Sequence, residues 1–307
     1  MTRNLLQWFA REKRPMPWRA APAPYACWLS EIMMQQTTYQ TVLPYYERFL
    51  KKFPDVASLA AADERAVLKA WEGMGYYARA RNLHKAAKKI ASEGWPQTAA
   101  AWAAVPGVGP YTAAALASVL AGEKVPVVDG NVARVFARYW RLDDDFRKLP
   151  ARARLAERLR PYIARTDAPG DFNQAMMELG ALVCTPANPA CGECPLSRAC
   201  AARKAGVQAD YPRKAEKKPL PVRKVMAAVV TDGKGKVLLV ENREGGLLKG
   251  LWELPAMTPA GEHVQVFSHF RLEMSVVRAV RAARFVDPKA VPLATATRKV
   301  LARCGLL

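Results

Sequence analysis

The chain has no long apolar run. Nothing in its 307 residues approaches the ~20 consecutive apolar residues that a membrane span requires. The stretch from Met1 to Pro17 is amphipathic and charged, and it lacks the apolar centre of a signal peptide. No internal repeat of the solenoid type is present. We therefore expect a cytoplasmic protein, where thiols stay reduced and clustered cysteines indicate a metal rather than disulfides.

Acidic residues are scarce relative to basic ones. The chain carries 27 Asp and Glu against 47 Lys and Arg, a formal net charge of +20. Contacts of Lys and Arg to phosphates release condensed counterions, so this excess favours a polyanion, nucleic acid first, as the partner. A ribosomal, membrane-surface or merely solubilising role would give the same excess, so charge alone does not decide among them.

The spacing of apolar residues divides the chain into two parts. Up to about Cys200 they recur at three- and four-residue spacing, which predicts helices at 25–36, 43–53, 64–73, 78–93, 112–121, 131–140, 151–164 and 172–183. From 223 onward the period is two, with a hairpin turn at 232–235, a strand at 270–276 and a closing helix at 294–304. Between them, three prolines and several basic residues predict an extended linker. The predicted domains are therefore 1–200 (helical), 201–222 (linker) and 223–307 (small mixed α/β).

Four of the six cysteines lie within seventeen residues, in the pattern C-x6-C-x2-C-x5-C: Cys184, Cys191, Cys194 and Cys200. Four thiolates this close can hold a zinc ion or an iron–sulfur cluster. Zinc sites usually pair two short hooks, and only one gap here is short, so the spacing favours a cluster. A reduced set without metal is the alternative. Cys27 and Cys304 stand apart and are interpreted as packing residues.

A glycine-rich turn at Val105–Thr112 joins two predicted helices. Gly107 and Gly109 allow a sharp turn that exposes backbone N–H groups, a geometry that suits a phosphate oxygen. A connector without ligand is the alternative. Twenty residues after Gly109 comes Asp129, which the local sequence predicts as a helix N-cap. A carboxylate bonded by N–H groups stays ionised, as a group facing a developing cation must.

Glu31 lies in an otherwise mostly apolar predicted helix. A buried carboxyl has a raised pKa and can hold a proton near neutral pH, which would make Glu31 a candidate general acid. A position on the solvated face of the helix is the alternative.

Six segments together resemble the MutY family of adenine-specific DNA glycosylases, within the endonuclease III superfamily. They occur in family order and cover the chain to about Cys200, at 29–37, 73–84, 105–113, 128–135, 172–180 and 184–200. The resemblance implies an all-α helix-hairpin-helix glycosylase domain with a [4Fe–4S] cluster loop, in base excision repair. The implied partner is double-stranded DNA with an adenine opposite 8-oxoguanine or guanine, bound by a monomer.

The resemblance also implies roles for individual residues. Glu31 would protonate the adenine, and Asp129 would stabilise or trap the sugar cation, supported by Tyr111 and Asn131. The base pocket would be lined by Trp18, Arg19 and Glu178. Gln36 and Tyr76 would enter the DNA stack near the damaged guanine. The chemistry agrees, because adenine leaves poorly until protonated and its bond breaks through an oxocarbenium-like state. Ordinary core packing is the alternative for Tyr76 and Tyr77.

Position 111 distinguishes activities within the superfamily. Relatives that also cleave the strand place there a lysine, whose amine forms a Schiff base with the sugar. Tyr111 has no such amine, so the sequence predicts base excision with little or no lyase activity. A bifunctional glycosylase for oxidised pyrimidines and a catalytically inert DNA-binding module are the competing hypotheses.

The C-terminal part resembles the family's NUDIX-like domain, which recognises 8-oxoguanine. The resemblance rests on Lys249–Pro255 and on Phe267, Ser268 and His269, which would contact the lesion. No Gly-x5-Glu-x7-Arg-Glu-x2-Glu-Glu run is present, so no pyrophosphohydrolase site is predicted. Only eleven residues separate Pro255 from Phe267, so either the domain is abbreviated or its lesion selectivity is expected to be weaker.

Overall fold

The computed structural model describes residues 1–20, 22–213, 227–243, 248–266, 271–279 and 283–307, without side-chain detail between 258 and 282. The chain divides into two compact units. The first comprises 1–36 and 89–218, and the second comprises 37–88 and 219–307. Each unit is described by itself. None of the described helices has the length and apolar character needed to cross a membrane.

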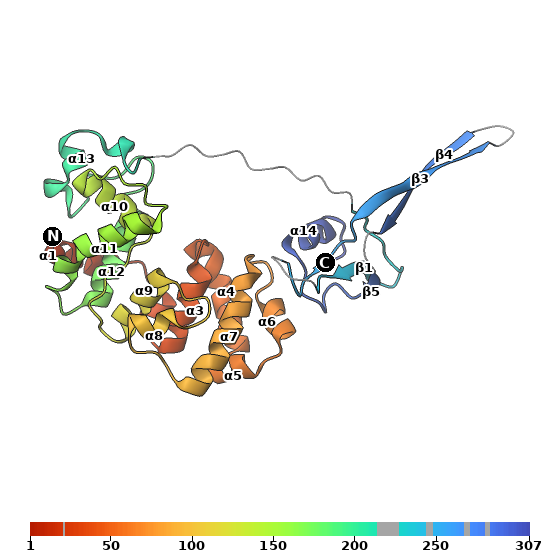
Figure 1. The fold of residues 1–307 in the computed structure, drawn as a ribbon, viewed down its shortest axis with the longest axis horizontal. Helices are drawn as coiled ribbons and strands as arrows, with labels where there is room; N and C mark the ends of the chain where they lie inside the picture. The colour runs from red at the N-terminus through yellow and green to blue at the C-terminus, as the bar shows by residue number, and fades with distance from the viewer. Residues whose placement is uncertain (21, 214–226, 244–247, 267–270, 280–282) are drawn as a thin grey trace. The chain divides into compact units, whose positions relative to one another are not determined.

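The first unit is helical throughout its described residues. Its helices, coloured from red to green in Figure 1, are α1 (Thr2–Glu12), α2 (Pro17–Ala20), α3 (Pro24–Met34), α8 (Ala99–Ala103), α9 (Pro110–Leu120), α10 (Gly130–Trp140), α11 (Leu149–Ile163), α12 (Pro169–Leu182) and α13 (Ala201–Lys204), with 3-10 turns η1 (Ser197–Ala199) and η2 (Gln208–Asp210). Helix α12 packs against α1, α9 and α10, and its buried residues include Phe172 and Leu179. Burial of these apolar faces is the main source of stability of such a helical unit.

The glycine-rich turn joins α8 to α9 as the sequence predicts. Gly107 has a φ of 78°, a left-handed conformation that glycine adopts without a steric penalty. The amide of Val108 donates to the carbonyl of Val105 at 3.1 Å, which closes the turn. Pro110 then begins α9, where a missing N–H costs nothing. This is a helix-hairpin-helix arrangement.

The first part of the predicted linker, 201–222, contains two short helical elements. Residues 201–204 form α13, and residues 208–210 form the 3-10 turn η2. Ala202 is fully buried and Tyr211 is 3% exposed, both in the core with Phe136 and Phe172. A four-residue helix and a 3-10 turn are too short to show apolar periodicity, so the sequence pattern fades before the packed domain ends.

The second unit combines four helices with the C-terminal strands. The helices are α4 (Tyr39–Lys52), α5 (Val56–Ala61), α6 (Glu64–Ala70) and most of α7 (Tyr77–Glu93). The remaining elements are β1 (Val237–Glu241), β2 (Trp252–Glu253), β3 (Met257–Val266), β4 (Arg271–Ala279), β5 (Arg284–Val286) and α14 (Thr295–Arg303). The contacts between these parts include two hydrogen bonds: the Tyr77 hydroxyl donates to the Leu293 carbonyl at 2.9 Å, and the Lys69 ammonium donates to the Val291 carbonyl at 2.9 Å.

The strands form two antiparallel sheets, in the order β2-β1-β5 and β3-β4. The predicted turn at 232–235 is present, since the Asp232 amide donates to the Lys236 carbonyl at 3.1 Å and Thr231 pairs with Val237. Strand β4 overlaps the predicted strand at 270–276, and α14 matches the predicted closing helix within one residue at each end. Phe267, Ser268 and His269, the predicted lesion contacts, lie outside the described residues.

Candidate active site

Glu31 lies on α3, whose other residues are mostly buried. Trp28, Leu29 and Ile32, its neighbours on this helix, are buried in the core. Glu31 itself is half-buried, so its carboxyl is surrounded by protein yet reachable. Burial, the largest influence, raises the pKa of Glu31 to about 7, with a further rise from Asp129 and opposing effects of Tyr111 and Arg19. A carboxyl with this pKa is half protonated at neutral pH.

Tyr111, in the first turn of α9, contacts the Glu31 carboxyl through its hydroxyl. The same hydroxyl lies 3.3 Å from the sulfur of Met177. Burial and the charges of Glu31 and Asp129 raise the pKa of Tyr111 well above its ordinary value, so the phenol stays protonated and can act as a hydrogen-bond donor. Of the two carboxyls, Glu31 hydrogen-bonds to this hydroxyl, and Asp129 affects its pKa only through its charge.

Asp129 is the N-cap of α10, as the local sequence predicts. Its Oδ1 accepts the Val132 amide at 2.7 Å, and its Oδ2 accepts the Asn131 side-chain amide at 2.8 Å. Burial nevertheless raises the pKa of Asp129 against these hydrogen bonds and the charge of Arg134. Desolvation of the half-buried carboxyl is the largest of these influences on its pKa.

Hydrogen bonds connect Asn131, which holds Asp129, to Cys184 at the start of the cysteine loop, residues 184–200. Arg134 donates to the Asn131 side-chain carbonyl at 2.8 Å, to the Gly180 carbonyl at 2.7 Å and to the Cys184 carbonyl at 2.8 Å. Helices α10 and α12 can approach this closely because Gly180 has no side chain. A Cβ at position 180 would lie 2.6 Å from the Cβ and 3.0 Å from the Cα of Asn131.

The predicted pocket residues Arg19 and Glu178 form an ion pair. Glu178 is 2% exposed, and each of its oxygens accepts from Arg19, at 3.3 and 3.2 Å. Arg14 adds a bidentate contact at 2.7 and 2.9 Å and a backbone amide at 3.0 Å. Burial alone would raise the pKa of Glu178, but these hydrogen bonds and the charge of Arg19 together lower it to about 2. Trp18 precedes Arg19 in the chain and is buried. Its carbonyl accepts a hydrogen bond from the Cys27 thiol at 3.6 Å.

The two residues predicted to enter DNA share an unusual backbone conformation. Among the described residues, the non-glycine positions with positive φ include Gln36, at 57°, and Tyr76, at 50°. Both side chains are exposed, and 53% of Tyr76 is accessible. Tyr77, by contrast, is buried, so the two adjacent tyrosines have separate roles. Strained, exposed positions of this kind are typical of functional sites.

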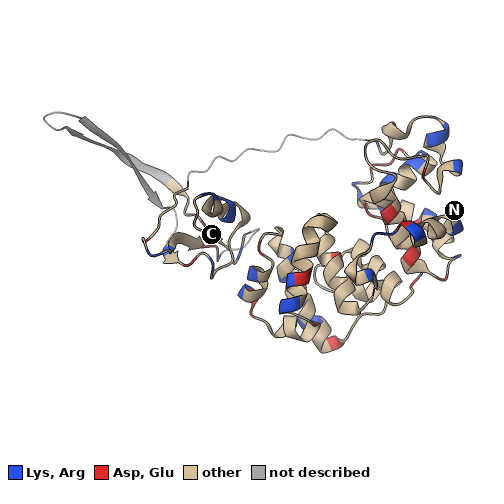
Figure 2. Ribbon diagram, turned by 180° about the vertical axis from the view of Figure 1, so that it is seen from behind, with Lys and Arg blue, Asp and Glu red and all other residues tan. Residues whose placement is uncertain are grey.

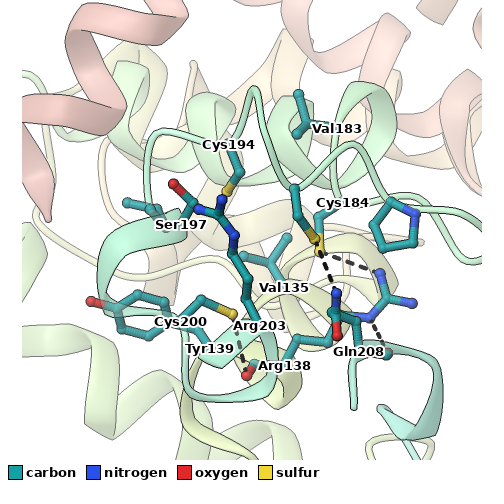
Figure 3. Close-up of a pocket in the computed structure, with 13 residues that line it drawn as sticks. Val135, Arg138, Tyr139, Val183, Cys184, Cys194, Ser197, Cys200, Arg203 and Gln208 are labelled. Carbon is teal, nitrogen blue, oxygen red and sulfur yellow. Dashed lines mark hydrogen bonds between the residues drawn. The ribbon is translucent and has the colours of Figure 1, made fainter. Parts of the chain in front are cut away.

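The four clustered cysteines line one small pocket, with a cavity volume of about 30 Å³, in the first unit (Figure 3). All are free thiols. Arg138 donates to the Cys184 sulfur at 3.4 Å and to the Thr185 carbonyl at 2.6 Å, and Gln208 donates to the Cys191 sulfur at 3.8 Å. N–H groups directed at sulfur are a common second layer around metal-bound thiolates.

The chemistry of this donor set, four free thiols that line one pocket, fits a thiolate-bound metal ion or an iron–sulfur cluster. In the described part of the chain, no three His, Cys, Asp or Glu side chains converge closely enough to hold one metal ion. A tetrahedral zinc site brings its sulfurs to about 3.8 Å from one another, given Zn–S bonds of about 2.3 Å. An iron–sulfur cluster separates the thiolates more widely, because each binds a different iron.

Three arginines that the sequence analysis missed hold this site together: Arg14, Arg134 and Arg138. Each makes at least one contact to a residue more than forty positions away. Arg138 is 2% exposed, and its position on the buried face of α10, next to Phe136 and Ala137, is the one sequence signal that could have identified it. A buried arginine requires partners, and backbone carbonyls of a tight loop suit its planar donors.

Comparisons with known proteins agree with this architecture. Residues 29–161 match the family model of the HhH-GPD superfamily base excision DNA repair proteins. A solved structure titled as a thermostable thymine-DNA glycosylase is 26% identical, with a TM-score of 0.60, over 66% of this chain and 95% of that chain. The fold and site thus define a helix-hairpin-helix protein of the base excision repair superfamily.

Curated relatives narrow the assignment. An adenine DNA glycosylase of Buchnera aphidicola subsp. Schizaphis graminum is 34% identical over 82% of this chain and 73% of its own length. The adenine DNA glycosylase of Rattus norvegicus is 36% identical over 85% of this chain and 61% of its own length. The chain belongs to the adenine DNA glycosylase family, and it spans about three fifths of the mammalian relatives that it matches.

Proposed function

We propose that this protein hydrolyses the N-glycosidic bond of adenine paired with 8-oxoguanine or guanine, after the nucleotide has been flipped out of double-stranded DNA. One observation carries the proposal: the half-buried Glu31 carboxyl, whose pKa burial raises to about 7, hydrogen-bonds to the Tyr111 hydroxyl, while Asp129, held by Val132 and Asn131, is near enough for its charge to raise the pKa of both groups. Adenine departs readily only when protonated, and a sugar cation needs a nearby anion, so this pair suits both requirements.

The two carboxyls have different tasks. Glu31 donates a proton to the adenine ring, and Tyr111 orients its carboxyl. Asp129 receives more hydrogen bonds than Glu31, from Val132 and Asn131, so it gives up its proton first and faces the developing positive charge of the sugar. In the base pocket, Glu178 stays ionised because Arg14 and Arg19 donate hydrogen bonds to it. Toward the substrate it can therefore accept a hydrogen bond but cannot donate one.

The absence of an amine distinguishes this proposal from a bifunctional glycosylase. Tyr111 occupies the first turn of α9 where a lyase would place its nucleophilic lysine, and its phenol stays protonated. Trapping with borohydride should therefore yield little covalent adduct with DNA. An abundant adduct would contradict monofunctional excision.

The cysteine pocket is proposed to hold a [4Fe–4S] cluster through Cys184, Cys191, Cys194 and Cys200. When bound, the cluster would supply a crosslink that fixes the loop following α12. Arg134 and Arg138 both donate to this loop, so its order bears on the start of α10 and on Asp129.

DNA binding is supported by charge and by exposed backbone. The net charge is +20, and Figure 2 shows Lys and Arg on helices of both units. Gly107 and Gly109 are exposed at the start of α9, where N–H groups can bind a phosphate. Gln36 and Tyr76 would fill the space that the flipped nucleotide leaves. We assign the C-terminal part, 223–307, to recognition of 8-oxoguanine as an abbreviated NUDIX-like domain.

The test is release of adenine from duplexes that place it opposite 8-oxoguanine, guanine, cytosine or thymine. We expect release opposite 8-oxoguanine and guanine and little opposite the other two. Glu47→Gln is the matched control for Glu31→Gln, because Glu47 is an exposed glutamate on α4. Equal release opposite all four bases would refute the mispair assignment, and no release from any duplex would refute the enzyme.

A further inference from the structure

Arg79, in the first turn of α7, lies between two aromatic rings. Its guanidinium carbon is 5.4 Å from the centre of the Trp71 ring and 5.2 Å from the centre of the Tyr76 ring. Trp71 is fully buried, and its indole N–H donates to the Gly75 carbonyl at 3.0 Å, so this ring is fixed. The guanidinium therefore connects a rigid core ring to an exposed one.

The exposed ring of Tyr76 is not held in place by core packing. Tyr76 has a φ of 50° and is 53% exposed, so packing into the core does not determine the direction of its side chain. The Arg79 amide donates to the Tyr76 carbonyl at 2.8 Å, which fixes the backbone. The guanidinium on the ring then restricts the side chain, because a cation prefers the face of an aromatic ring.

A third contact of Arg79 reaches Thr37, the neighbour of Gln36, which is the other predicted DNA-contacting residue with a positive φ. The Arg79 Nη2 donates to the Thr37 hydroxyl at 3.3 Å, and Thr37 directly follows Gln36 in the chain. Gln36 has a φ of 57°. A planar guanidinium can contact two ring faces and still donate at its edge, whereas the ammonium of a lysine cannot do all three.

We propose that Arg79 is a positioning residue that holds Tyr76, and through Thr37 also Gln36, in the conformation that enters DNA before DNA binds. The inference rests on the proposed function, which assigns Tyr76 and Gln36 to that task. Preforming these side chains would lower the cost of opening the duplex and so speed the step before bond cleavage.

The test is a double-mutant cycle on adenine release, measured with enzyme in excess over DNA but below saturation. Arg79→Met should slow release roughly five- to thirty-fold, the range that a partly desolvated cation–π contact represents. In a Tyr76→Ala background, Arg79→Met should slow adenine release only about twofold, because only the contact of Arg79 to Thr37 is then lost. Thr37→Val alone should slow release by the same roughly twofold factor. Arg79→Lys should restore release only in part. Equal slowing by Arg79→Met in both backgrounds, or full rescue by lysine, would overturn the proposal.

Lys85→Gln is the matched control, because Lys85 is exposed on the same helix and its loss removes the same charge. It should leave release unchanged, and an effect as large as that of Arg79→Met would also overturn the proposal. A 2-aminopurine placed beside 8-oxoguanine reports unstacking without any bond cleavage. Its fluorescence should rise more slowly with Arg79→Met than with wild type, and an unchanged rise would count against the proposal. Wild-type protein that releases no adenine would instead refute the proposed function.

Discussion

Changing Gly180 to alanine should slow adenine release far more than it destabilises the fold. The new Cβ would lie 2.6 Å from the Cβ of Asn131, whereas ordinary contact begins at 3.4 Å, so α10 and α12 must separate by about 0.8 Å. The Asn131 side chain and the Val132 amide donate the hydrogen bonds that orient Asp129. A displacement of Asn131 therefore also displaces the Asp129 carboxyl. A misplacement of about 1 Å costs on the order of a hundredfold in rate.

The expected loss of stability is smaller, about 1 kcal/mol. Overpacking costs about 1–3 kcal/mol, and the higher helix propensity of alanine offsets about 1 kcal/mol of it. Single-turnover release and urea unfolding of the same preparation separate the two effects. Gly192→Ala is the control, since nothing lies within 4 Å of a Cβ there. A Gly180→Ala variant with wild-type release would refute the argument that close approach of these helices positions Asp129.

Three further outcomes follow from the site. Because burial raises the pKa of Glu31 to about 7 and the protonated form is the donor, adenine release should fall as pH rises through about 7; a rate that rises over this range would contradict the role. Arg14→Gln should lower the free energy of unfolding at pH 7 by about 2 kcal/mol, less than for a pair with a single partner because Arg19 remains. Since the pKa of Glu178 is lowered to about 2, this loss should diminish as pH falls below about 4.5 in urea titrations, and a constant loss would exclude the ion pair as its cause. Cys194→Ser should reduce bound iron and visible absorption relative to Cys304→Ser, whose thiol is exposed and outside the pocket; a colourless wild-type protein that contains zinc would refute the cluster.

Much of the helical part could be predicted from sequence, because its helices are long enough to show a period of 3.6 residues. The cap at Asp129 and the turn at Gly107 depend on neighbours in sequence, and both were predicted. The short α13 lacks a period and was missed. Arg14 and Arg79 could not be found this way, because their partners Glu178 and Thr37 are distant in the chain. The raised pKa of Asp129 depends on burial, which the local sequence does not reveal.

The most direct measurement of the central claim is single-turnover release of adenine opposite 8-oxoguanine by wild type, Glu31→Gln and Glu47→Gln at pH 7. Loss of a general acid costs about 10²–10⁴-fold, so we expect Glu31→Gln to be slower by at least a hundredfold and Glu47→Gln to match wild type. Release by Glu31→Gln at the wild-type rate would contradict the account.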